Sequence, residues 1–122
     1  WQGLTMAECE AWDAARLSWL RESPFDRARP GGESLAQVAG RAMEALDAVL
    51  ERHRGATVLV VSHGGTIRGV LRSLGFVDAA AHVVGNASIT QLTATVASAR
   101  IQWSLDVLGE SDHLAAVEAM GS

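Results

Sequence analysis

Hydrophobic residues recur at helical spacing in three stretches of the chain. The stretches cover residues 6–22, residues 34–55 and residues 66–75, and each ends at a turn signal formed by Ser-Pro or by a glycine. The first two also begin with a capping box, in which a serine or threonine is followed three residues later by glutamate or glutamine. The sequence therefore predicts three helices. The capping pairs are Thr5 with Glu8 and Ser34 with Gln37.

A different pattern stands between the second and third helices. Residues 58–61 read Val-Leu-Val-Val, a continuous and mostly β-branched run that is typical of a strand buried on both faces of a parallel sheet. Such a strand, here residues 57–62, needs parallel neighbours, which are usually reached through βαβ crossovers. The sequence has no second run of this kind. We therefore expect that the neighbouring strands belong to an N-terminal part of the domain that precedes Trp1.

Residues 88–95 and 100–107 partly alternate between apolar and polar side chains, and a short segment of small residues, 96–99, separates them. This pattern predicts an antiparallel hairpin at the edge of a sheet. The tail from Gly109 is predicted to be helical at best. With helices and a buried strand upstream of the hairpin, the fold class is α/β.

Composition restricts the function classes. The chain has 122 residues, of which 48% are hydrophobic and 20% charged, and this is typical of one globular domain. The net charge of −4 is spread along the chain, so neither a nucleic acid nor a membrane surface is expected as a partner. Cys9 is the only cysteine, and no signal peptide or membrane-spanning stretch is apparent, so we expect a cytoplasmic setting. No pattern predicts the oligomeric state.

His63 is the first candidate for a catalytic residue, because it stands where the apolar run ends and two glycines follow. Ligands of open parallel sheets bind at the carboxyl ends of strands, where the N-terminus of the next helix offers N–H groups to an anion. Gly64 and Gly65 would let the backbone approach a phosphate closely, and a positioned imidazole would stabilise the charge of a phosphoryl-transfer transition state. The alternative is a histidine that only satisfies backbone groups at the end of the strand.

Five motifs give this site a context. WQGLT, PGGES, VLVVSHGGTIR, NASIT and DHL, in this order, resemble the C-terminal portion of the histidine phosphatase superfamily, which is phosphoglycerate-mutase-like. The resemblance implies a three-layer α/β/α sandwich with a mostly parallel sheet, incomplete here, and a single domain of which residues 1–122 form the C-terminal portion. It also implies a nucleophilic histidine in an Arg-His-Gly motif, which this sequence lacks, and catalysis without a metal or another cofactor.

By the same resemblance, His63 is the second catalytic histidine of the family, and Gly64, Glu33 and Asn86 are substrate-binding candidates. Glu33 would orient a group beside the site, although the PGGES motif also has a purely structural role because Ser34 caps a helix. Asn86 would lie near the phosphate, although asparagine after a glycine is also a common turn residue.

The chain has further arginines and histidines that could bind an anion or a metal ion. Arg27 and Arg29 could reach a substrate anion, although a solvated loop is the commoner place for such charges. The remaining histidines show no metal-ligand spacing with each other or with Cys9, so no metal site is expected. These histidines are His53, His82 and His113.

The expected function is hydrolysis of a small-molecule phosphate monoester through a phosphohistidine, carried out by the intact parent protein. The 122 residues alone are expected to be inactive, because they contain no candidate for the nucleophile, for two clamping arginines or for the acid that protonates the leaving group. Two alternatives remain, a mutase-type phosphotransferase and a non-catalytic binding module. The His-Gly-Gly of an esterase oxyanion hole would require a downstream Gly-x-Ser-x-Gly, which is absent.

Overall fold

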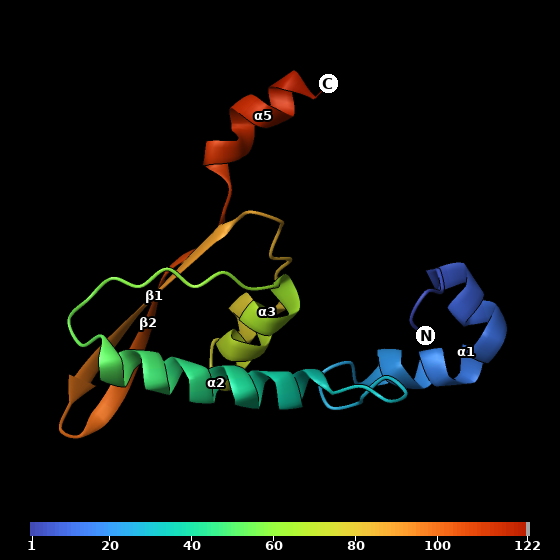
Figure 1. Ribbon diagram of the computed structural model, residues 1–122, viewed down its shortest axis with the longest axis horizontal. Coiled ribbons are helices and arrows are strands. Elements are labelled where there is room, and N and C mark those ends of the chain that lie inside the picture. Colours follow the sequence, from blue (N-terminus) through green and yellow to red (C-terminus); the bar gives the residue numbers. More distant parts are fainter. Residues whose placement is uncertain (122) are drawn as a thin grey trace. The chain divides into compact units, whose positions relative to one another are not determined.

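The computed structural model describes residues 1–121 and divides into two compact units, Trp1–Val58 and a second unit that starts at Leu59 (Figure 1). The first unit contains helices α1 (Met6–Glu22) and α2 (Leu35–Arg52). The second contains α3 (Gly64–Ser73), α4 (Val77–Ala81), strands β1 (Ile89–Ala97) and β2 (Arg100–Glu110), the 3-10 turn η1 (Asp112–Leu114) and α5 (Ala115–Met120).

Helix α1 confirms the predicted range and its capping box. The Thr5 hydroxyl accepts from the backbone N–H of Glu8 at 3.2 Å, and the Glu8 carboxylate accepts from the N–H of Thr5 at 2.6 Å. The helix is kinked at Asp13, whose carboxylate accepts from the N–H of Arg16 at 2.9 Å and so caps the second half. Trp12, directly before the kink, is 80% exposed.

Helix α2 also starts as predicted. The Ser34 hydroxyl accepts from the N–H of Gln37 at 3.1 Å, while the Gln37 side chain accepts from the N–H of Ser34 at 2.8 Å. The helix ends at Arg52, with Gly55 beyond it in the left-handed region (φ 73°). Ser34 is only 5% exposed, so this cap is a buried contact and not a surface detail.

The strand predicted for residues 57–62 does not form in this structure. The segment carries no strand assignment, and its apolar side chains are solvent-exposed, with exposed fractions of 44% for Val58, 89% for Leu59, 55% for Val60 and 91% for Val61. The prediction of a buried strand is therefore wrong here. The physical reason is that a strand exists only as part of a ladder, and the sheet of the described chain consists of β1 and β2 alone.

Helices α3 and α4 pack together in the second unit, with Leu71 fully buried and Val70 nearly so. Helix α3 begins two residues before its predicted start and ends, as expected, just before Gly75, whose φ is 90°. The N–H of Phe76 returns to the Leu71 carbonyl at 2.9 Å, which closes the helix end. The five-residue helix α4 was not predicted.

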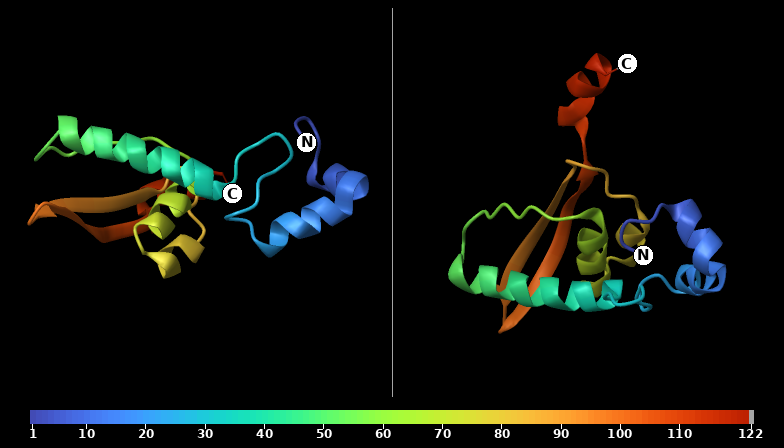
Figure 2. Two further views of the ribbon diagram at one scale, coloured as in Figure 1. Left: turned by 90° about the horizontal axis from the view of Figure 1, so that it is seen from below. Right: turned by 45° about the vertical axis from the view of Figure 1, so that its right-hand side comes forward.

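The hairpin is confirmed, and Figure 2 shows its two strands running side by side. Directly opposed pairs on one face are apolar, and the turn is tightened to two residues, Ser98 and Ala99, which both have positive φ. The apolar pairs are Leu92 with Leu105, Ala94 with Trp103 and Val96 with Ile101. Within residues 1–121 the sheet is thus antiparallel, and the mostly parallel sheet expected for the whole domain is not seen. None of the helices described combines the length and the apolar character needed to cross a membrane.

Candidate functional site

His63 is the residue that caps helix α3. Its backbone is extended (φ −105°, ψ 151°), and its carbonyl accepts from the N–H of Ile67 at 3.0 Å, so the helix begins directly after it. The His63 side chain makes no capping hydrogen bond and is exposed. The first turn contains no acidic residue. The end of α3 therefore offers unpaired N–H groups and an available imidazole to an anion.

Gly64 stands at the first position of α3 against the segment that leads into β1. A Cβ at this position would lie 2.9 Å from the carbonyl oxygen of Val84, a distance that side-chain carbons do not tolerate. Glycine is thus required for the close approach of two backbones. The glycine expected to let a phosphate approach has a packing role in this structure.

Asn86 lies in a tight turn two residues beyond Val84. The N–H and the hydroxyl of Ser88 both donate to the Gly85 carbonyl, at 3.4 and 2.8 Å, and Ala87 has a positive φ of 55°. The Asn86 side chain is exposed. Val84, two residues before Asn86, lies against Gly64 at the start of α3, so the segment that leads into the Asn86 turn passes this helix end.

Glu33 belongs to the first unit, where its partner is Arg41 of α2. The two side chains form a bidentate pair, with Nε to Oε1 at 3.0 Å and Nη2 to Oε2 at 2.6 Å. The Arg41 hydrogen bond holds the pKa of Glu33 below its usual value, and the Glu33 carboxylate raises the pKa of Arg41. The sequence analysis did not predict this ion pair, although Arg41 lies in the predicted helix, eight residues after the glutamate of the PGGES motif.

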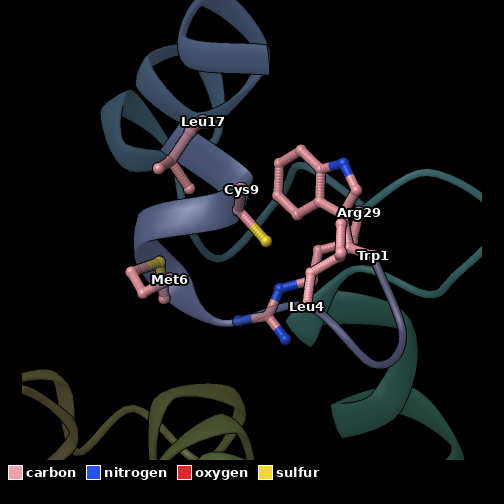
Figure 3. A pocket seen from close by; sticks show the side chains of 6 residues that line it. All are labelled: Trp1, Leu4, Met6, Cys9, Leu17 and Arg29. Atoms are coloured by element: carbon pink, nitrogen blue, oxygen red, sulfur yellow. The ribbon is translucent and has the colours of Figure 1, made fainter. Parts of the chain in front are cut away.

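The two candidate loop arginines have separate surroundings. Arg27 donates to the Glu22 carboxylate at 2.8 Å and to the carbonyl of Trp19, and it stacks over the Trp19 ring at 4.7 Å, so its charge is engaged within the first unit. Arg29 lines a small hollow of about 120 Å³ whose other walls are mainly apolar (Figure 3). Those walls are Trp1, Leu4, Met6, Cys9 and Leu17.

The structure also bears on whether the chain has a metal-binding site. In the part of the chain that the structure describes, no group of three histidine, cysteine, aspartate or glutamate side chains lies close enough to hold a metal ion. Independently of this, the imidazole of His63 stands at the N-terminus of α3, and such an arrangement suits the binding of a phosphoryl group.

A protein-family comparison matches the model of the histidine phosphatase superfamily, branch 1, to residues 1–106. The chain belongs to this superfamily. The match includes His63, Gly64, Glu33 and Asn86, and it leaves only the last part of β2 and the segments after it outside.

Relatives of this chain include a phosphatase and a bifunctional protein. A metal-independent phosphoserine phosphatase of Arabidopsis thaliana is 35% identical over 118 residues, which is 95% of this chain and 47% of that protein. A bifunctional protein of Mycobacterium tuberculosis is 40% identical over 73 residues, 59% of this chain and 20% of that protein. The chain thus spans about half of the plant relative and a fifth of the mycobacterial one.

Solved structures agree with the family assignment. A mycobacterial glucosyl-3-phosphoglycerate phosphatase, solved with VO3, superposes with a TM-score of 0.71 at 35% identity over 91% of this chain and 58% of that one. The Bacillus stearothermophilus protein YhfR superposes with a TM-score of 0.73 at 24% identity, over 93% of this chain and 56% of that one, and supports the fold. The described residues thus match a part of the structures of phosphoglycerate-mutase-like phosphatases.

Proposed function

We propose that this chain supplies the second histidine of a phosphatase site that hydrolyses phosphate monoesters through a phosphohistidine. The observation that carries the proposal is His63 at the cap of α3, with an exposed side chain that makes no capping hydrogen bond. A histidine phosphatase chain with an imidazole at this place can donate an N–H to an equatorial oxygen of the phosphoryl group. That hydrogen bond strengthens as charge spreads over these oxygens in the transition state.

The rest of the machinery is proposed to come from outside these residues. No Arg-His-Gly occurs in the 122 residues. In the proposed reaction, a nitrogen of that missing histidine attacks phosphorus, the bond from phosphorus to the ester oxygen breaks, and an acid protonates the leaving oxygen. Water then attacks the phosphohistidine and releases phosphate. Residues 1–122 would form the C-terminal portion of one such domain, with a mostly parallel sheet between two helical layers.

Three further residues are proposed to serve the substrate. Gly64 would keep the end of α3 open to the phosphate, and the exposed amide of Asn86 would hydrogen-bond to it from the neighbouring turn. Glu33 stays ionised because Arg41 binds it, so it would act as an acceptor that orients a cationic group of the site and not as a proton donor.

The substrate is proposed to be a small molecule. The names of two relatives specify phosphoserine and glucosyl-3-phosphoglycerate, and both are small phosphate monoesters. The proposed transfer is to water. Transfer to a second phosphate acceptor would instead favour the mutase-type alternative.

The proposal is tested in the full-length protein with an aryl phosphate as substrate. His63→Ala is expected to lower kcat by about 10² to 10³, as the loss of one transition-state donor does, with the circular dichroism spectrum unchanged. His53→Ala is the matched control, because His53 is exposed and lies outside the proposed site. Near-normal activity of a correctly folded His63→Ala variant would refute the assignment. The 122-residue chain alone is expected to be inactive, so turnover by it that His63→Ala abolishes would point to different chemistry.

A further inference from the structure

The Asp-His-Leu motif of the sequence forms η1 and has no part in the function proposed above. His113, its middle residue, places Nε2 at 2.9 Å from the carbonyl oxygen of Ala87. A backbone carbonyl can only accept a hydrogen bond, so Nε2 carries a proton and donates it. The hydrogen bond joins residues 26 positions apart in the sequence.

The other ring nitrogen of His113 lies near a carboxylate. Nδ1 of His113 lies 3.7 Å from one carboxylate oxygen of Glu110, and the other oxygen of Glu110 accepts from the N–H of Asp112 at 2.6 Å. Glu110 is the last residue of β2, so His113 lies close to the end of the hairpin. A distance of 3.7 Å is too long for a hydrogen bond, so the hydrogen bond to Ala87 is the contact that orients the ring.

The hydrogen bond from His113 stabilises the backbone conformation of Ala87. Its φ of 55° lies in the left-handed region, which a residue with a Cβ occupies at an energetic cost. The two hydrogen bonds from Ser88 to Gly85 close the turn internally but leave its carbonyl at Ala87 to be satisfied from outside. His113 satisfies it.

The anchored turn is next to the proposed phosphate site. Asn86 directly precedes Ala87, and Val84 contacts the start of α3 at Gly64. On the other side of the same segment, the backbone at Gly109 approaches the carbonyl of Val83, and the Gly109 N–H donates to the Thr90 hydroxyl at 3.1 Å. Residues 83–88 thus lie between the start of α3 and the end of β2, and His113 binds the carbonyl of Ala87 near the C-terminal end of this segment.

We infer that His113 is a positioning residue, which fixes the turn that carries Asn86 through its hydrogen bond to the carbonyl of Ala87. The inference rests on the proposed function, because it assigns Asn86 to a bound phosphate. The anchoring of the turn itself does not depend on any activity.

The anchoring is tested first in the 122-residue chain by backbone NMR relaxation of residues 85–88. His113→Leu is expected to lower the order parameters of Asn86 and Ala87 from about 0.85 to below about 0.6. His113→Gln, whose amide N–H can reach the same carbonyl, is expected to keep them high. His82→Leu is the matched control, since the ring of His82 also contacts a backbone carbonyl, but that of Asp78 in α4 and not one in the turn. Unchanged order in His113→Leu would overturn the inference.

The effect on binding is tested in the full-length enzyme by a double-mutant cycle. His113→Leu and Asn86→Ala are each expected to raise KM for an aryl phosphate about 5- to 10-fold, with a smaller change in kcat. The effect of His113→Leu should disappear in the Asn86→Ala background, and His113→Gln should restore most of the wild-type KM. Additive effects would overturn the inference. Absence of hydrolysis by the wild type would refute the proposed function and leave the relaxation result to decide the anchoring.

Discussion

Replacing Gly64 by alanine tests the close approach of backbones at the start of α3. The added methyl carbon would lie 2.9 Å from the carbonyl oxygen of Val84, which is part of a backbone and cannot rotate away. Gly40 provides the matched control. It is an exposed glycine inside α2, and a Cβ there meets nothing within 4 Å.

The two substitutions are expected to change the free energy of unfolding in opposite directions. In an open helical position, alanine is more favourable than glycine by about 1 kcal/mol, so Gly40→Ala should stabilise the chain. At Gly64 the helix gain is opposed by overpacking, which costs about 1–3 kcal/mol when a well-packed neighbour must move. The difference between the two variants is therefore about 1–3 kcal/mol in favour of Gly40→Ala.

The assay is thermal and urea unfolding of the two variants, followed by circular dichroism. At about 4 °C per kcal/mol for a domain of this size, the midpoints should differ by about 4–12 °C, with Gly64→Ala the lower. Gly64→Val, with a larger side chain, should be lower still. A Gly64→Ala variant as stable as Gly40→Ala would show that the contact with Val84 is not as tight as described.

Two further predictions concern the first unit. The carboxyl group of Glu33 should titrate below the ordinary glutamate range in an NMR pH series, because Arg41 stabilises the charged form, and Arg41→Leu should move this pKa upward. Because the pKa of Glu33 is lower in the folded than in the unfolded state, any stability that the Glu33–Arg41 pair contributes is present above the unfolded pKa. This stability is lost as the pH falls through the folded pKa. A Glu33 pKa that does not move in Arg41→Leu would contradict the role given to Arg41. Ser34→Ala should cost about 1–2 kcal/mol of unfolding free energy and Thr5→Ala about 0.5–1 kcal/mol, because the Ser34 cap is buried and the Thr5 cap is exposed. The reverse order in urea unfolding would show that burial does not set the strength of these caps.

The sequence predicted the features that depend on neighbouring residues. The capping boxes at Thr5 and Ser34 and the hairpin turn near Ser98 are local, because each is decided by side chains within a few positions. The burial of residues 57–62 was predicted from their composition alone, and burial also requires partners, which the described residues do not provide. The kink at Asp13 was missed because an aspartate within a helical pattern can either face solvent or cap a second helix.

At the candidate site the same division holds. His63 and Gly64 were recognised because a motif places them together, and in the structure a helix begins directly after His63, two residues before the predicted start. The contacts of Arg41 with Glu33 and of His113 with Ala87 join residues 8 and 26 positions apart. Such contacts depend on how the elements are arranged in space, so the hydrophobic periodicity of the sequence does not predict them.

The exposed apolar segment at residues 58–61 has a consequence for the behaviour of the chain in solution. Its side chains are mostly in water, and its backbone N–H and C=O groups have no ladder partner within the described residues. An extended, uncharged, β-branched stretch of this kind is a template on which a second copy of itself can pair. Self-association should therefore increase steeply with protein concentration. One lysine in place of Leu59 should suppress it more than the same change at Trp12, whose side chain is also largely exposed but belongs to a helix.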